Sequence, residues 1–151
     1  MDLTGVYQEV ILEHNRSPRN WGELADASRT VHGHNPLCGD KLQLWVKFDG
    51  DRVADVRFRG EGCAISKASA SMMTQAVKGK TKAEAEALFE RFHALVTGTA
   101  DAETRASLGR LEAFAGVSRL PTRVKCATLA WHALHEAVAG DGAASPPGAT
   151  S

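Results

Sequence analysis

The sequence has no excess of charge of either sign and no long apolar run. Lysine plus arginine and aspartate plus glutamate both number 18, so the formal net charge is zero. Without a basic stripe to displace the counterions of a phosphate backbone, we expect no nucleic-acid partner. No apolar stretch approaches the length of a membrane span, and the first residues lack the basic and apolar regions of a secretion signal. We therefore expect a cytoplasmic protein with no membrane partner.

Cysteine is scarce, with three residues among 151. Three cysteines cannot all pair within one chain, and a reducing cytosol disfavours disulfides, so metal binding or thiol chemistry is the better explanation for them. No Cys-x-x-Cys pair is present, which makes a thiol-redox protein the weaker interpretation. The remaining composition is ordinary, because 43% hydrophobic and 24% charged residues are typical of a soluble, folded protein. The length predicts one domain, which we place at residues 1–140.

The apolar periods predict a helix first, then strands, then several helices. Residues 28–34 and 41–48 alternate as strands, and residues 53–59 alternate after a turn signal, with Ala54, Val56 and Phe58 facing inward. Helical spacing is present in residues 4–15, after Gly62, after a predicted capping box, more weakly at 103–114, and after Pro121.

This order of segments predicts an α+β domain. We expect a small antiparallel three-stranded sheet with helices packed on one face. Residues 141–151 are rich in glycine, alanine, serine and proline and show no apolar period. They are predicted to form a disordered C-terminal tail.

The three cysteines lie beside features that favour chemistry. Cys38 is in a loop before a predicted strand, where Gly39 allows a tight turn that points Cys38 and Asp40 the same way. Cys63 lies where a helix begins, so free N–H groups and the helix dipole favour its thiolate. Cys126 lies in the early turns of the last helix, which can pack back over this end of the sheet. The topology therefore predicts that these side chains meet.

Three thiolates and a carboxylate suit either zinc or an iron-sulfur cluster. Such a ligand set binds Zn²⁺ with an excess of negative charge, which is unfavourable to bury without nearby cations. Arg123 and Lys125, beside the third cysteine, are candidates for this charge support, and Arg123 lies on nearly the same helix face. His32 and His34 are close to the first cysteine, but a solvent-facing strand end is the expected place for them. Taken singly, each cysteine could instead be a small buried hydrophobe.

Each cysteine lies in a short segment that resembles a known sequence motif. The segments read Asn35-Pro36-Leu37-Cys38-Gly39-Asp40, Gly60-Glu61-Gly62-Cys63-Ala64-Ile65-Ser66 and Arg123-Val124-Lys125-Cys126-Ala127. In this order the three motifs resemble those of the IscU/SufU family of iron-sulfur cluster assembly proteins, and the resemblance runs from about residue 3 to residue 139. Two features resemble the SufU branch: a longer chain between the second and third cysteines, and Lys125 where the IscU type has histidine.

The resemblance implies a zinc site made by Cys38, Asp40, Cys63 and Cys126, with a SufS-like cysteine desulfurase as partner. It implies that Cys38 is the sulfur acceptor of a zinc-dependent sulfurtransferase. The alternative is a non-catalytic scaffold, on which Cys38, Cys63 and Cys126 hold a transient [2Fe-2S] cluster. Such a cluster would be handed to downstream cluster assembly or acceptor proteins.

Overall fold

A computed structural model describes residues 9–35 and 39–139. The three strands form one antiparallel sheet in the order β1-β2-β3, so the predicted α+β class and three-stranded sheet are confirmed. The predicted tail, residues 141–151, lies outside the described residues. The elements in chain order are α1 (Glu9–Arg16), β1 (Arg29–Asn35), β2 (Asp40–Asp49), β3 (Arg52–Glu61), α2 (Ala64–Val77), α3 (Lys82–Thr97), α4 (Ala102–Ser107), the 3₁₀ helix η2 (Gly109–Arg119) and α5 (Pro121–Ala139).

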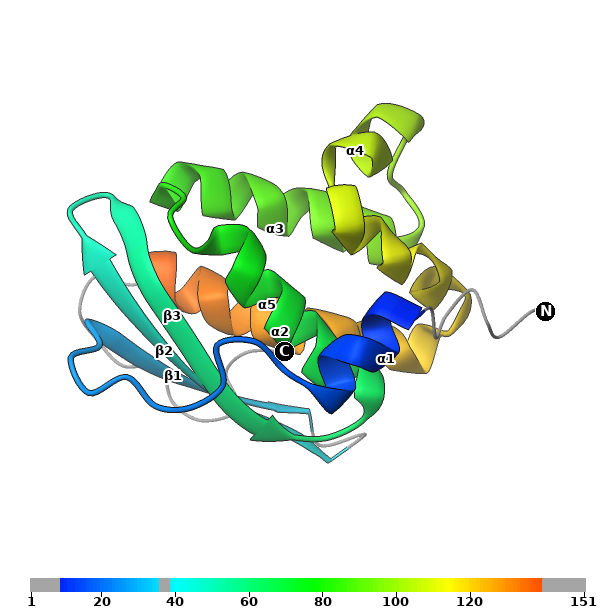
Figure 1. The fold of residues 1–151 in the computed structure, drawn as a ribbon. Helices are drawn as coiled ribbons and strands as arrows, with labels where there is room; N and C mark the ends of the chain where they lie inside the picture. Colours follow the sequence, from blue (N-terminus) through cyan, green and yellow to red (C-terminus); the bar gives the residue numbers. More distant parts are fainter. Residues whose placement is uncertain (1–8, 36–38, 140–151) are drawn as a thin grey trace.

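Helices α2 and α5 cover one face of the sheet, as predicted, with α2 against β3 and α5 against β1 and β2 (Figure 1). Helix α1 packs on α2, while α3 and η2 pack on α5 and on each other. Because α2 lies between the sheet and outer helices, it is buried on most sides rather than along one stripe. Among the helices described, none is long and apolar enough to cross a membrane.

The inward face of β3 differs in part from the prediction. Val56 and Phe58 are buried as predicted, but Ala54 is exposed and Val53 is fully buried. The cause is a shift of register between β2 and β3 near their hairpin, where consecutive residues of β2 pair with residues of β3 that are two positions apart. The extra residue of such a bulge reverses which side chains face the core. The strict alternation expected from the sequence was therefore wrong at Ala54.

Two buried hydrogen bonds fix the position of α2 relative to α5. The hydroxyl of Ser69 in α2 donates to the carbonyl oxygen of Ala127 in α5 at 2.5 Å. The indole Nε1–H of Trp131, one turn further along α5, donates to the same hydroxyl oxygen at 3.2 Å. Both bonds are shielded from water, where an unmade bond would leave a polar group unsatisfied. They hold together α2, which begins next to Cys63, and α5, which contains Cys126.

The other end of α2 is tied to the β2–β3 hairpin by backbone groups. The N–H of Val53 donates to the carbonyl of Lys80, and the N–H of Gly79 donates to the carbonyl of Val53, both at 2.8 Å. Directly afterwards, α3 begins with the predicted capping box. Thr81 Oγ1 accepts from the N–H of Glu84 at 3.1 Å, and Glu84 Oε1 accepts from the N–H of Thr81 at 2.9 Å.

Candidate metal centre

Asp40, Cys63 and Cys126 converge at one end of the sheet. A carboxylate oxygen and the two sulfur atoms all lie within 4.8 Å of one another. Asp40 is the first residue of β2, Cys63 is the N-cap of α2, and Cys126 lies in the second turn of α5. Three separate elements therefore each supply one potential ligand. Cys38 lies outside the described residues, so its predicted place in this site stays a prediction.

The Asp40 carboxylate is fully buried, with 0% of the residue exposed. Its Oδ1 accepts a hydrogen bond from the backbone N–H of Cys63 at 3.1 Å. Among residues 9–35 and 39–139, its Oδ2 has no hydrogen-bond partner. A buried carboxylate oxygen without a partner is unfavourable, and a bound cation removes that penalty. The environment of Asp40 thus fits the predicted metal-ligand role.

Gly62 makes the approach of Asp40 to Cys63 possible. A Cβ atom at position 62 would overlap the Asp40 carboxylate. Glycine is the usual residue where backbone must pass this close to another group. Sequence reasoning placed Gly62 in a motif but missed this contact, because it joins the start of β2 to the residue that follows β3. The only local signal is a glycine directly before a candidate ligand.

The surroundings of Cys63 favour its thiolate. Together they lower the pKa of Cys63 from its ordinary value to about 6, and the largest cause is a hydrogen bond from the Cys126 thiol to the Cys63 sulfur. The backbone N–H groups of Ser66 and Ile65 act in the same direction, while burial and the Asp40 carboxylate act in the opposite one. The sulfur also caps α2, accepting from the N–H of Ser66 at 3.4 Å. The predicted helix-start thiolate therefore has a physical basis.

Asn35 belongs to the surroundings of Cys126 and was missed from sequence. Its side-chain Nδ2–H donates to the Cys126 sulfur at 3.9 Å, and only 5% of the residue is exposed. Asn35 ends β1 and lies directly opposite Asp40 in the strand register. An amide donor next to a sulfur stabilises negative charge there. Sequence patterning does not single out Asn35, because its partner is far away in the chain.

The remaining candidate residues from the sequence are two histidines of β1 and Arg123 of α5. His32 and His34 occupy the strand face opposite the buried Asn35, with His32 exposed and His34 half-buried. Within the described ranges, neither histidine joins the group of ligand atoms. Arg123 lies in α5 one turn before Cys126 and is half-buried. Its role in charge support stays a prediction.

Comparison with known proteins places this site in a family. The family model described as the NifU-like N terminal domain matches residues 6–98. The chain is 48% identical over 138 residues to the "Zinc-dependent sulfurtransferase SufU" of Bacillus subtilis (strain 168), covering 91% of this chain and 92% of that protein. It is 46% identical to the "Iron-sulfur cluster assembly scaffold protein IscU" of Streptococcus pyogenes serotype M1, covering 90% of this chain and 84% of that protein.

A solved structure shows the same fold. The crystal structure of an iron-sulfur cluster assembly scaffold protein for the SUF system from Fervidobacterium Islandicum AW-1 aligns with a TM-score of 0.82 and 35% sequence identity. The alignment covers 91% of this chain and 99% of that one. The fold, the sequence identity and the matched family model agree. The chain belongs to the NifU-like N-terminal domain family, together with the IscU and SufU iron-sulfur cluster assembly proteins.

Proposed function

We propose that this chain is a zinc-binding sulfur acceptor and carrier for iron-sulfur cluster assembly in the cytoplasm, acting as a single domain of residues 1–140. In this role it takes persulfide sulfur from a SufS-like cysteine desulfurase and passes it to downstream assembly or acceptor proteins. The observation that carries the proposal is the buried Asp40 carboxylate, one oxygen of which has no hydrogen-bond partner in the described part of the chain and lies beside two thiols. The similarity to a relative named as a zinc-dependent sulfurtransferase supports it.

The proposed ligands of zinc are Asp40, Cys63 and Cys126, with Cys38 as the fourth. Two sulfurs and one carboxylate oxygen within 4.8 Å of one another match the donors that zinc accepts. Zinc, when bound, keeps the coordinating thiolates deprotonated at neutral pH. Arg123, one turn before Cys126, is proposed to offset the negative charge of the ligand set.

Cys38 is the proposed sulfur acceptor. Its thiolate attacks the terminal sulfur of the desulfurase persulfide, a new S–S bond forms at Cys38, and the desulfurase cysteine leaves as a thiolate. No external oxidant or reductant is required, because the terminal sulfur only changes its partner. Cys63, at a helix start, and Cys126, within a helix, are held by secondary structure and serve as ligands rather than acceptors.

Persulfide mapping tests this assignment. The protein is mixed with a cysteine desulfurase and cysteine, persulfides are trapped with an alkylating reagent, and the labelled cysteine is identified by mass spectrometry. We expect the label first on Cys38 and its loss in Cys38→Ser. Cys63→Ser and Cys126→Ser remove proposed ligands but leave the acceptor, so any label that forms in them should still be found on Cys38. Label found first on Cys63 or Cys126, or undiminished transfer by Cys38→Ser, contradicts the assignment.

The second candidate function is a scaffold for a transient [2Fe-2S] cluster. It is favoured by the similarity to the relative named as an IscU scaffold, and by the fact that thiolates serve clusters as well as zinc. Metal analysis after anaerobic purification separates the two functions. Zinc near one equivalent per chain supports the carrier, whereas brown protein containing iron and sulfide supports the scaffold. In the scaffold case, Asp40→Ala should prolong the life of the cluster, because a carboxylate is the harder, weaker ligand.

A further inference from the structure

A separate cavity lies among helices α1, α2, α3 and the α4–η2 segment. Its volume is about 300 Å³. On α2 it is lined from Met72 onward, about two and a half helical turns beyond Cys63, so it does not belong to the metal centre. A volume of about 300 Å³ is at the lower end of the range for small-molecule sites.

The cavity wall combines five apolar residues with five polar ones. This combination is typical of ligand sites, where apolar contacts provide affinity and a few polar groups provide orientation. The apolar residues are Met72, Ala76, Leu88, Leu108 and Leu111, and the polar ones are His14, Gln75, Lys80, Ser107 and Arg110.

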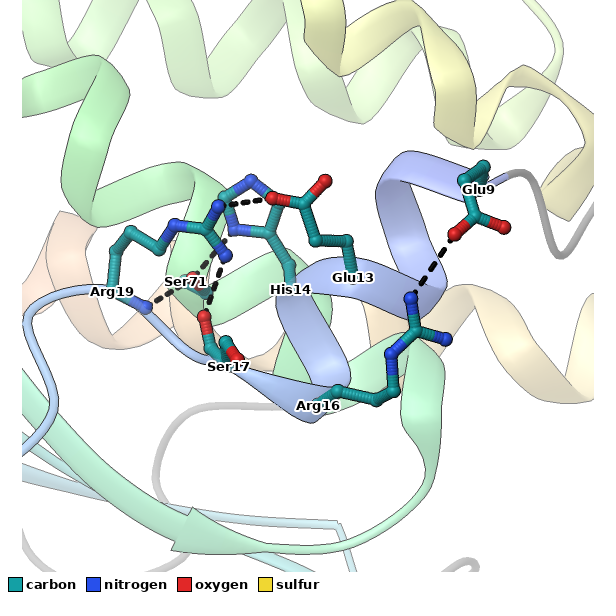
Figure 2. Close-up of polar contacts among 7 residues, drawn as sticks. All are labelled: Glu9, Glu13, His14, Arg16, Ser17, Arg19 and Ser71. Atoms are coloured by element: carbon teal, nitrogen blue, oxygen red, sulfur yellow. Dashed lines mark hydrogen bonds and ion pairs between the residues drawn. The ribbon is translucent and has the colours of Figure 1, made fainter.

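His14 is the one residue of this polar set that is buried, with 1% exposed. Its Nδ1 lies 2.7 Å from the hydroxyl oxygen of Ser71, and that oxygen accepts the backbone N–H of Arg19 at 2.8 Å. Figure 2 shows this arrangement, with the second ring nitrogen of His14 directed away from Ser71. The Ser71 hydroxyl oxygen already accepts the N–H of Arg19, which leaves its own hydrogen to donate. We therefore assign the hydroxyl as the donor to Nδ1, which puts the ring proton on Nε2.

In this assignment the Nε2–H of His14 is a hydrogen-bond donor beside the cavity, and within residues 9–35 and 39–139 it has no other acceptor. Burial lowers the pKa of His14, and the Arg19 and Arg110 charges act in the same direction, so the neutral form of the ring is favoured. Glu13 acts in the opposite direction but is paired with Arg19 at the surface. The donor is therefore present over the physiological pH range.

Two cations stand at the rim of the cavity. Arg110 of η2 and Lys80 of the α2–α3 connection both line it and are exposed. No acidic residue is among the described residues of the wall. A neutral N–H donor and two cations next to apolar side chains favour a ligand with an anionic group at one end and a hydrocarbon part at the other. A planar carboxylate matches the guanidinium fork of Arg110.

We propose that this cavity binds a small carboxylate with an apolar body. The carboxylate contacts the Nε2–H of His14 and the guanidinium of Arg110, and Lys80 adds electrostatic attraction. The hydrocarbon part packs on Met72, Leu88 and Leu111. This inference is independent of the sulfur-carrier function.

A titration of the full-length protein with hexanoate tests the proposal. Methyl signals of Met72, Leu88 and Leu111 are followed by NMR, with acetate and hexan-1-ol as probes that lack the body and the charge. We expect saturable shifts with hexanoate and binding at least about tenfold weaker for hexan-1-ol, since one charge-assisted hydrogen bond is worth about that factor. Acetate should also bind at least about tenfold more weakly, because it lacks the CH₂ groups that would be buried. Equal binding of hexan-1-ol, or no saturable shift with hexanoate, overturns the proposal.

Two further measurements keep the test independent of a folding defect. Arg110→Gln should weaken hexanoate binding about tenfold. Arg119→Gln, an exposed arginine of the same helix that does not line the cavity, should leave binding unchanged. The ¹⁵N shifts of His14 should report the Nε2–H tautomer. Equal weakening by both variants, or an Nδ1–H tautomer, contradicts the inference.

Discussion

The two ends of helix α2 both lie near β-strands, but they differ in how completely the described polar groups around them are hydrogen-bonded. At the C-terminal end, the backbone groups of Val53 and Gly79 are paired with carbonyl oxygens at 2.8 Å. At the N-terminal end, a buried oxygen of Asp40 has no partner in the described part of the chain, and the pKa of Cys63 is lowered to about 6. Backbone hydrogen bonds satisfy the first end, whereas we propose that a bound metal completes the second. Changes at the first end should alter stability, and changes at the second should alter metal binding.

Removing a sulfur from the N-terminal end should have the largest effect. Cys63→Ser and Cys126→Ser are expected to lose most of the bound metal, and with it the stability that metal gives the folded state. A ligand at a thousand times its dissociation constant adds about 4 kcal/mol to the free energy of unfolding. Elemental analysis after gel filtration, and melting curves with and without a chelator, measure both effects. A variant that retains a full equivalent of metal would remove that cysteine from the ligand set.

A methyl group placed against Asp40 should have the next largest effect. Gly62→Ala is expected to displace the carboxylate and lower metal affinity about 10- to 100-fold, the usual range for groups that support a ligand. The matched control is Gly79→Ala at the other end of α2, where a Cβ meets open space but the backbone φ is +86°. That variant should lower the free energy of unfolding by about 1 kcal/mol and leave metal affinity unchanged. Competition with a chromophoric chelator reads out affinity, and equal affinities in both variants would refute the contrast.

The lowered pKa of Cys63 predicts a pH dependence for the metal-free protein. In the unfolded chain a cysteine titrates near pH 8.5, whereas in the folded chain Cys63 titrates at about 6. The folded state therefore binds fewer protons between these values, so this contribution to stability is full above about pH 8.5 and is lost as pH falls through about 6. Denaturant titrations and the pH profile of Cys63 alkylation measure it. Cys63→Ser should lack this dependence, and an alkylation midpoint near 8.5 would contradict the prediction.

Removal of the N-cap of α3, which lies next to the C-terminal end of α2, should have the smallest effect. Thr81→Ala removes the hydroxyl that accepts the N–H of Glu84, and should lower the free energy of unfolding by about 1 kcal/mol. Metal content and affinity should not change, because α3 contributes no ligand in the described site. Equilibrium unfolding and elemental analysis together check both statements. A loss of metal in this variant would show that the two ends of α2 are coupled.

Local patterns predicted those parts of the molecule that local interactions determine. The capping box at Thr81, the helix after Pro121 and the helix start at Cys63 each follow from residues within one turn of one another. The meeting of Asp40, Cys63 and Cys126 was also predicted, because strand order and chain direction bring these positions to one end of the sheet.

The missed features depend on contacts between distant segments. The bond from Asn35 to Cys126 spans 91 positions, and the bond from His14 to Ser71 spans 57. No period within one element encodes such a pair. The exposure of Ala54 has a similar cause, since a bulge depends on the register of the neighbouring strand rather than on alternation along its own. Sequence patterns therefore predicted the elements better than their exact mutual register.

The hydroxyl of Ser69, shared between Ala127 and Trp131, also bears on which ions the site can select. Because it holds α2 and α5 at one separation, the backbones at Cys63 and Cys126 cannot move apart without breaking buried hydrogen bonds. The distance between the two sulfurs can then change only by rotation of their side chains. A larger thiophilic ion such as Cd²⁺ would have to be accommodated within that range or by ligands outside the two helices. Discrimination by ionic radius would in this way depend on a serine that is not a candidate ligand.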